Sequence, residues 1–382
     1  MSRFLTTRRA AVAGLMLSAL AFGAPAQAQT PAQKTHVKLG FLGPLSGGNA
    51  QQGLGARNGF LLAIEQANAV TDAPYEFEGV VVDDASDPQT GVSAAMKLVN
   101  DPQLAAATGH WNSSVALATM PVFARFQTPL VIWGAISPAI TDQNLPQVTR
   151  VTPTLLTENK PLSEWAVKTL GARRIAIIAD TSDFGKANAE SVAQFVPEAG
   201  GEIVSTDLFP VGSTDFRTIL TALKSRDVNA VFFGGVITEA GILARQMKEV
   251  GLDVPMLGNS GMYDPEFIAV AGDAATMAIV SYPSAAATPK LAQLDADYAA
   301  RGFAEPASPY TKYAFDATNI LIQAINQVGV EDKVALAGAI RSIEHDGANG
   351  MITFDENGQT RTPIAIELKT VRDGAWGPYE GK

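Results

Sequence analysis

The chain has 382 residues, of which 47% are hydrophobic, and its 28 basic and 38 acidic residues give a formal net charge of −10. This acidic balance argues against nucleic acid as a partner. Because the chain contains no cysteine, disulfides, thiolate nucleophiles and a lipidated cysteine are all excluded. At about 150 residues per domain, the length predicts two domains with a core each.

The first 28 residues have the three parts of an export signal. Arg3, Arg8 and Arg9 form a basic start, residues 10–22 are apolar but too short to span a bilayer, and Ala28 ends a small-x-small cleavage site. We therefore expect cleavage near Ala28 and a periplasmic protein, with general and twin-arginine export both open. No later apolar run reaches the ~18 residues of a membrane span, so we expect no direct membrane insertion.

Strand and helix patterns alternate along the first part of the exported chain. A strand, helix, strand order is typical of a parallel sheet with helices on both faces. The β-branched runs predict strands at 37–43, 75–83, 104–109 and 130–133, with helices at 53–69, 89–100 and 115–126.

A second series of the same kind begins after Thr152-Pro153-Thr154. Two further helices, at 291–300 and 313–328, have no strand between them and are expected to cross back to the first lobe. The sequence thus predicts an α/β protein of two doubly wound parallel-sheet lobes. The second series has strands at 174–180, 202–208, 230–233 and near 256 and 279, and helices at 185–198, 216–225 and 239–250.

Several acidic residues are explained by local structure. Asp87 and Asp264 each precede a proline, a pattern that predicts a helix N-cap. Asp83 and Asp84 end a strand and favour a capped turn over a metal site. The three histidines are far apart in the sequence, and no phosphate-binding loop or nucleophile elbow occurs. We expect no cofactor and no metal.

Two junctions between a strand and a helix are the best candidates for a site. After strand 104–109, Ser113 places a hydroxyl and free backbone N–H groups at the positive end of a helix, which would hold a carboxylate. After strand 130–133, Gly134 permits close approach of a ligand. Both junctions lie at the carboxyl ends of parallel strands, the edge at which open α/β sheets bind ligands.

These patterns carry a family resemblance along the whole exported chain. The matching segments resemble the leucine/isoleucine/valine-binding proteins of ABC importers. The resemblance implies a type I periplasmic binding fold, in which two lobes close on one small ligand and then dock on a membrane permease, with no catalysis. We also expect a monomer. The segments are residues 37–47, 83–88, 109–114, 137–141 and 233–235.

The resemblance also implies how the chain divides. The lobes would be joined by three crossings, near Thr152, Pro283 and Thr360. Residues 1–28 would be the signal peptide. The first lobe would be 29–152 plus 283–360, and the second lobe would be 153–282 plus 361–382.

The resemblance further implies a set of ligand-binding residues. Ser113 would hold the ligand carboxylate through its hydroxyl and amide, Gly134 and Ile136 would contribute backbone contacts, and Trp111 would offer a flat aromatic surface. Phe184 would contribute to an apolar wall. The full set is Gln52, Trp111, Asn112, Ser113, Gly134, Ala135, Ile136, Phe184, Val236 and Ser260.

Ser260 bears on the identity of the ligand. It stands where amino-acid binders of this family carry an acid that pairs with the ligand ammonium, and a buried ammonium without an acceptor would cost several kcal/mol. The sequence therefore favours an amine-free aromatic or branched carboxylate. A branched-chain amino acid stays open if Asp264 or Glu239 supplies the acid. A ligand sensor of the same fold and an exported enzyme also stay open.

Overall fold

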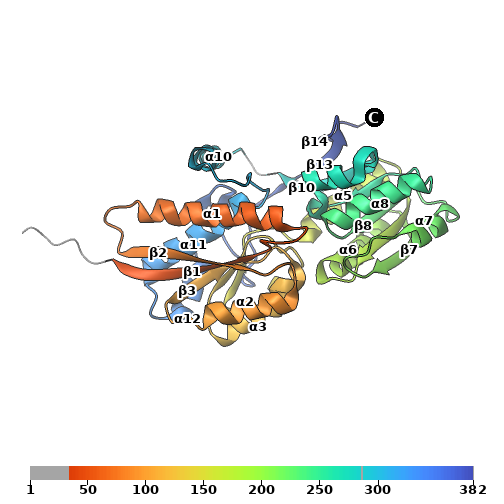
Figure 1. Ribbon diagram of the computed structural model, residues 1–382. Helices are drawn as coiled ribbons and strands as arrows, with labels where there is room; N and C mark the ends of the chain where they lie inside the picture. Colours follow the sequence, from red (N-terminus) through yellow and green to blue (C-terminus); the bar gives the residue numbers. More distant parts are fainter. Residues whose placement is uncertain (1–33, 285–286, 382) are drawn as a thin grey trace, which may run out of the picture. The chain divides into compact units, whose positions relative to one another are not determined.

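The computed structural model describes residues 34–284 and 287–381, and these residues belong to one compact unit that begins at Lys34 (Figure 1). The predicted export signal and its cleavage site lie outside the described residues. Among the helices of the described ranges, none combines the length and the apolar character that a membrane span requires.

The first sheet has five strands, all parallel, in the order β2-β1-β3-β4-β5. The prediction of a parallel sheet is confirmed, and the predicted bounds of the second strand match β2. The last strand was not predicted. The strands are β1 (Thr35–Gly43), β2 (Tyr75–Asp83), β3 (Leu104–Thr108), β4 (Leu130–Ile132) and β5 (Val148–Arg150).

Helices cover both faces of the first sheet (Figure 1). Phe41 and Leu42 are neighbours in β1 but belong to different hydrophobic clusters, so each face of the strand has its own core. On the Phe41 face lie α1 (Ala50–Asn68) and α11 (Thr311–Val328), and on the Leu42 face lie α2 (Pro88–Val99) and α3 (Ser113–Arg125).

The second sheet has seven strands in the order β14-β13-β10-β9-β8-β6-β7. Five of its strands are parallel neighbours, as predicted, but β13 pairs antiparallel with β10 and β14 antiparallel with β13. The last two strands were not predicted. The strands are β6 (Arg174–Asp180), β7 (Glu202–Phe209), β8 (Ala230–Gly234), β9 (Met256–Gly258), β10 (Ala278–Ser284), β13 (Ala365–Arg372) and β14 (Ala375–Pro378).

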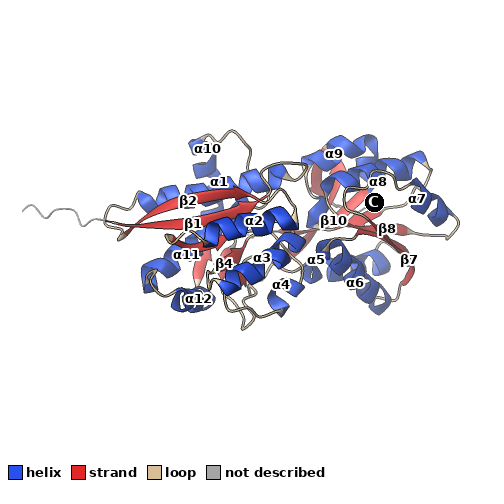
Figure 2. Ribbon diagram, turned by 60° about the horizontal axis from the view of Figure 1, so that its bottom comes forward, coloured by secondary structure: helices blue, strands red, loops and turns tan. Residues whose placement is uncertain are grey.

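This sheet is also covered on both faces (Figure 2). Ile177 packs with α5 and α6, while the next residue, Ile178, packs in the cluster that contains α7, α8 and α9. The prediction of two doubly wound lobes is therefore confirmed. The helices are α5 (Leu155–Lys168), α6 (Asp183–Glu198), α7 (Arg217–Lys224), α8 (Ile237–Glu249) and α9 (Pro265–Ala271).

The late helices return to the first sheet, as the sequence predicted. The α11 helix packs against α1, β3 and β4, and Leu294 of α10 (Pro289–Arg301) shares a small apolar cluster with Leu62 of α1. Two short helices, α4 (Ala139–Asp142) and α12 (Lys333–Arg341), complete this part of the fold.

Both predicted N-caps are present. The side chain of Asp87 accepts a hydrogen bond from the N–H of Thr90, and that of Asp264 accepts one from the N–H of Glu266. Each acid therefore has a structural role at the start of its helix. The predicted lobe boundaries near Thr152, Pro283 and Thr360 stay a prediction.

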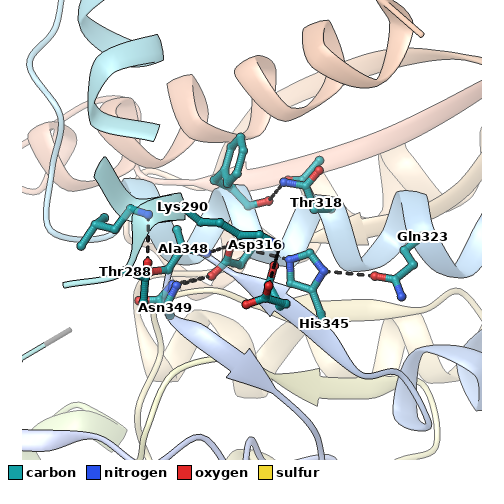
Figure 3. Close-up of polar contacts among 12 residues, drawn as sticks. Thr288, Lys290, Asp316, Thr318, Gln323, His345, Ala348 and Asn349 are labelled. Atoms are coloured by element: carbon teal, nitrogen blue, oxygen red, sulfur yellow. Dashed lines mark hydrogen bonds and ion pairs between the residues drawn. The ribbon is translucent and has the colours of Figure 1, made fainter. Parts of the chain in front are cut away.

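One buried carboxylate fixes the hairpin of β11 (His345–Gly347) and β12 (Gly350–Ile352) against α11 (Figure 3). Asp316 is fully buried and accepts hydrogen bonds from the backbone N–H groups of Ala348 (2.8 Å) and Asn349 (2.9 Å). The side-chain amide of Asn349 adds a third bond of 2.7 Å. These three bonds satisfy the buried Asp316 carboxylate and hold the β11–β12 hairpin against the first lobe.

Candidate functional site

A cavity of about 310 Å³, part of it open to solvent, lies where the loops after β3 and β4 meet loops of the second sheet. Its walls are mostly aromatic and aliphatic. They are formed by Trp111, Asn112, Ser113, Gly134, Ile136, Phe184, Val236, Gly261 and Tyr310.

The structure brings together seven of the ten predicted site residues around this cavity. The other three lie elsewhere. Ser260 lines a neighbouring cavity, Ala135 is fully buried behind the wall, and Gln52 is buried with its side-chain amide donating to Asp264. The predictions that Gln52 and Ala135 themselves contact a ligand therefore gain no support from the lining of either cavity.

The start of α3 supplies hydrogen-bond donors to the cavity. The first intrahelical bond runs from the N–H of Ala116 to the carbonyl of Asn112 (3.0 Å), so the N–H groups of Ser113 and Ser114 have no helical acceptor. The Ser113 hydroxyl accepts a bond from the N–H of Ser137 (3.2 Å) and retains its own proton for donation. This arrangement suits a carboxylate.

A buried arginine holds the second loop of the site. Arg150 is fully buried, and its Nη1 donates to the carbonyls of Ser137 (2.6 Å) and Ala135 (3.3 Å), while Nη2 donates to the Thr141 hydroxyl (2.9 Å). Burial lowers the pKa of Arg150 to about 9. The Ala135 carbonyl belongs to the same peptide unit as the N–H of Ile136, so the bond from Arg150 strengthens that N–H as a donor.

Aromatic rings form a rigid wall of the cavity. Tyr310 meets Trp111 edge to face at 6.2 Å and Trp133 at 6.0 Å, and Trp133 in turn stacks on Phe41 at 5.6 Å. The sequence did not point to Tyr310, because it lies just before α11, far along the chain from the other site residues. Rings fixed in this way would confine a flat or branched apolar group.

A second cavity, of about 280 Å³, shares the walls Ile136 and Tyr310 with the first. Its position coincides with two of the predicted crossings between lobes. Its other lining residues are Thr152, Pro153, Glu158, Ser260, Tyr282, Pro283, Pro309 and Tyr313.

The second cavity contains an acid that the sequence analysis missed. Glu158 is fully buried, and its carboxyl oxygens accept bonds from the N–H (2.8 Å) and the hydroxyl (2.9 Å) of Ser260. Burial raises its pKa to about 7, against the opposing effect of the two bonds from Ser260. Glu158 stands in a polar run of α5, a helix that was not predicted, so nothing in the sequence marked it as buried.

The two acids that the sequence offered as ammonium partners have other roles. Asp264 caps α9 and accepts a bond from Gln52, and Glu239 accepts one from the N–H of Gly212 (2.9 Å). Neither side chain is part of the lining of the two cavities. The structure adds a third acid to the two that the sequence offered, since Glu158 lies directly behind Ser260.

Comparison with known proteins identifies the family. The sequence profile of the periplasmic binding proteins matches residues 36–367. The chain therefore belongs to the periplasmic binding protein family, and it is a solute-binding protein of the leucine-binding-like kind rather than an enzyme.

Two relatives show how broad the similarity is. The chain is 29% identical to the leucine-, isoleucine-, valine-, threonine- and alanine-binding protein of Pseudomonas aeruginosa over 327 residues, or 85% of this chain and 87% of the relative. It is 30% identical to the Leu/Ile/Val-binding protein BraC3 of Rhizobium johnstonii over 334 residues, or 86% of this chain and 90% of the relative.

Solved structures confirm the fold. A leucine-binding protein from Thermotoga maritima superimposes with a TM-score of 0.82 at 24% identity, covering 90% of this chain and 97% of that one. A solute-binding protein of an ABC transporter from Rhodopseudomonas palustris, in complex with 3,4-dihydroxybenzoic acid, superimposes with a TM-score of 0.77 at 23% identity, covering 89% and 95%.

The role of Arg150 predicts a large loss of stability on its removal. Arg150→Met leaves the buried carbonyl of Ala135 without a donor and the carbonyl of Ser137 with only the N–H of Ile140, so we expect the free energy of unfolding to fall by about 3 kcal/mol. Urea unfolding measures it. Arg217→Met, which removes an exposed arginine paired with Asp215, is the control and should cost less than about 1 kcal/mol. Equal losses in the two variants would contradict the role of Arg150.

Glu158 predicts a dependence of stability on pH. Because folding raises its pKa from 4.5 to about 7, the native state holds this proton more tightly than the unfolded chain does. The contribution of protonated Glu158 is fully present below pH 4.5 and is lost as the pH rises through 7. Between those limits the ligand-free protein should lose on the order of 3 kcal/mol relative to Glu158→Gln, which cannot ionise.

Urea unfolding of both proteins at pH 4.5 and pH 8 measures this difference. The comparison with Glu158→Gln cancels the contributions of all other titrating groups that the two chains share. Parallel pH profiles for the two proteins would show that Glu158 is not buried as described.

Proposed function

We propose that this chain is the periplasmic solute-binding component of an ABC importer and that it captures a small carboxylate. The observation that carries the proposal is the opening of the α3 start onto an aromatic cavity, with the Ser113 hydroxyl and the N–H groups of Ser113 and Ser114 as donors. Charge-assisted bonds of this kind contribute about 1.5–3 kcal/mol each.

The apolar walls support an aromatic or branched acid as the ligand. Trp111, Phe184, Val236 and Tyr310 line the cavity, and a flat or branched group packs well against such side chains. The Rhodopseudomonas palustris structure holds 3,4-dihydroxybenzoic acid, which has this character. We take an amine-free aromatic or branched carboxylate as the first candidate.

A branched-chain amino acid is the second candidate, and a specific observation favours it. Glu158 has no cationic side chain within ion-pair distance among the described residues, and it lies in the cavity next to the proposed carboxylate site. The ammonium group of an amino-acid ligand would form an ion pair with Glu158. The names of the Pseudomonas aeruginosa and Rhizobium johnstonii relatives, which include leucine, isoleucine and valine, agree with this second candidate.

Two contacts between loops of the first and second sheets support closure around the ligand. The hydroxyl of Ser114 accepts a bond from the N–H of Asp183 (2.9 Å), and the side-chain amide of Gln52 donates to Asp264. The first contact joins the residues next to Ser113 and Phe184 of the first cavity, and the second joins residues that line neither cavity. We propose that ligand binding stabilises this closed arrangement, which a membrane permease then recognises, and that the protein acts as a monomer.

Ser113→Ala tests the proposed carboxylate site. The variant loses a charge-assisted donor, so we expect binding of benzoate, 4-methylpentanoate or leucine, whichever the protein takes, to weaken by about 1–3 kcal/mol. The free energy of unfolding without ligand should fall by about 1 kcal/mol, because the buried N–H of Ser137 loses its acceptor. Calorimetric titration measures the first quantity and urea unfolding the second.

Ser191→Ala is the matched control for this experiment. Ser191 is also a buried serine, but it bonds to Asn159 and to the carbonyl of Asn188, away from both cavities. Its replacement should leave the dissociation constant unchanged. An unchanged dissociation constant in Ser113→Ala as well would remove Ser113 from the site.

A further inference from the structure

The second cavity lies beside the first but differs from it in chemistry. Ile136 and Tyr310 belong to both, and Gly261 of the first cavity follows directly after Ser260 of the second. The first cavity offers hydrogen-bond donors, whereas the second offers an acid and a hydroxyl between tyrosine and proline side chains. A ligand that fills both cavities would therefore meet donors at one end and acceptors at the other.

Glu158 is held in place but has no cationic partner among the described residues. Its two bonds from Ser260 fix the carboxyl group, and each oxygen keeps a lone pair for a further donor. Among the described residues, no lysine, arginine or histidine forms an ion pair with it. A buried acid without a cation is costly unless it is protonated or receives further donors.

Thr152 is an independent sign of an incomplete site. It is 1% exposed, it lines the same cavity, and its hydroxyl oxygen has no hydrogen-bond partner in the part of the chain that the structure describes. Unpaired buried hydroxyls are rare in folded proteins, and one that lines a cavity beside an acid is explained by a bound polar group.

The walls of the second cavity strengthen any polar contact made there. Tyr282, Tyr310 and Tyr313 surround the acid with ring surface, and three prolines fill much of the remainder. Such surroundings exclude water, so a hydrogen bond or ion pair to Glu158 is worth more than it would be at the surface. Tyrosine rings also tolerate a cationic group.

The geometry points to a second subsite in which Glu158 and Thr152 receive a hydrogen-bond-donating group of the ligand, a hydroxyl or an amine, while Ser113 holds its carboxylate. This inference rests on the proposed function, because it assumes a carboxylate ligand in the first cavity. It makes Glu158 the residue that separates ligands with a donor group from those without one.

Matched ligands test the subsite. Leucine, 2-hydroxy-4-methylpentanoate and 4-methylpentanoate share one carbon skeleton and carry an amine, a hydroxyl or neither, and 4-hydroxybenzoate and benzoate form an aromatic pair. We expect the wild-type protein to bind a donor-bearing member at least tenfold more tightly than its donor-free counterpart in calorimetric titrations. Whether the amine or the hydroxyl is preferred identifies the donor.

Glu158→Gln should remove this preference. We expect at least a tenfold loss of affinity for the preferred donor-bearing ligand and less than a twofold change for the donor-free one. Glu239→Gln is the control, since Glu239 is also a buried acid but bonds to Gly212 outside both cavities, and it should change neither affinity. If Glu158→Gln does not fold, Thr152→Val provides the same comparison with the same expected selectivity.

The outcomes separate the two proposals. Loss of affinity for the donor-bearing ligand alone supports the subsite. If the variants bind both members of a pair as the wild-type protein does, or weaken both equally, the subsite is overturned while the carboxylate site stands. If no carboxylate of either kind binds to the wild-type protein, the proposed function fails, and the subsite fails with it.

Discussion

The proposed carboxylate site depends on one buried cation, Arg150. Its guanidinium bonds to the carbonyls of Ala135 and Ser137 and to the hydroxyl of Thr141, and its Nε donates to Gln359 (2.7 Å) on the returning C-terminal segment. Together with the backbone bonds from the N–H of Ala135 to the carbonyl of His110 (2.9 Å) and from the N–H of Leu155 to the carbonyl of Ile136 (3.0 Å), these bonds hold the loop after β4 in place. All partners of Arg150 in these contacts are neutral oxygens, so the charge is satisfied without an acid at the site.

The sheet supplies the second constraint. Because β3 and β4 are parallel neighbours, the loops that follow them emerge at the same edge, and the bond from the N–H of Ser137 to the Ser113 hydroxyl joins them there. Donors from both loops can then meet one anion. A hydrogen-bond acceptor lies on the other side of the shared walls Ile136 and Tyr310. It is Glu158, the one charged side chain among the described residues that line the second cavity.

Much of the fold and of the first cavity could be predicted from the sequence, because the informative patterns were local. Alternating strands and helices predicted the parallel first sheet and the five parallel strands of the second, and the order of strand, Ser113 and helix indicated a site at a sheet edge. The residues that were missed depend on contacts distant in sequence. Glu158 becomes buried only through its bonds to Ser260, and Tyr310 reaches the cavity only because α11 returns to the first sheet. The antiparallel β13 pairs with the distant β10, but its hairpin with β14 is local, and the Asp373-Gly374 turn between them is a hairpin signal that the sequence analysis overlooked.

The central claim is that the site recognises a carboxylate group. Thermal unfolding of the exported chain, refolded free of ligand, tests it most directly when each carboxylate is paired with its primary amide: benzoate with benzamide, 4-methylpentanoate with its amide, and leucine with leucinamide. A ligand at ~100 times its dissociation constant adds about 2.7 kcal/mol of stability. We predict a clear upward shift with at least one carboxylate and little or none with its amide. Equal shifts for acid and amide would contradict the account.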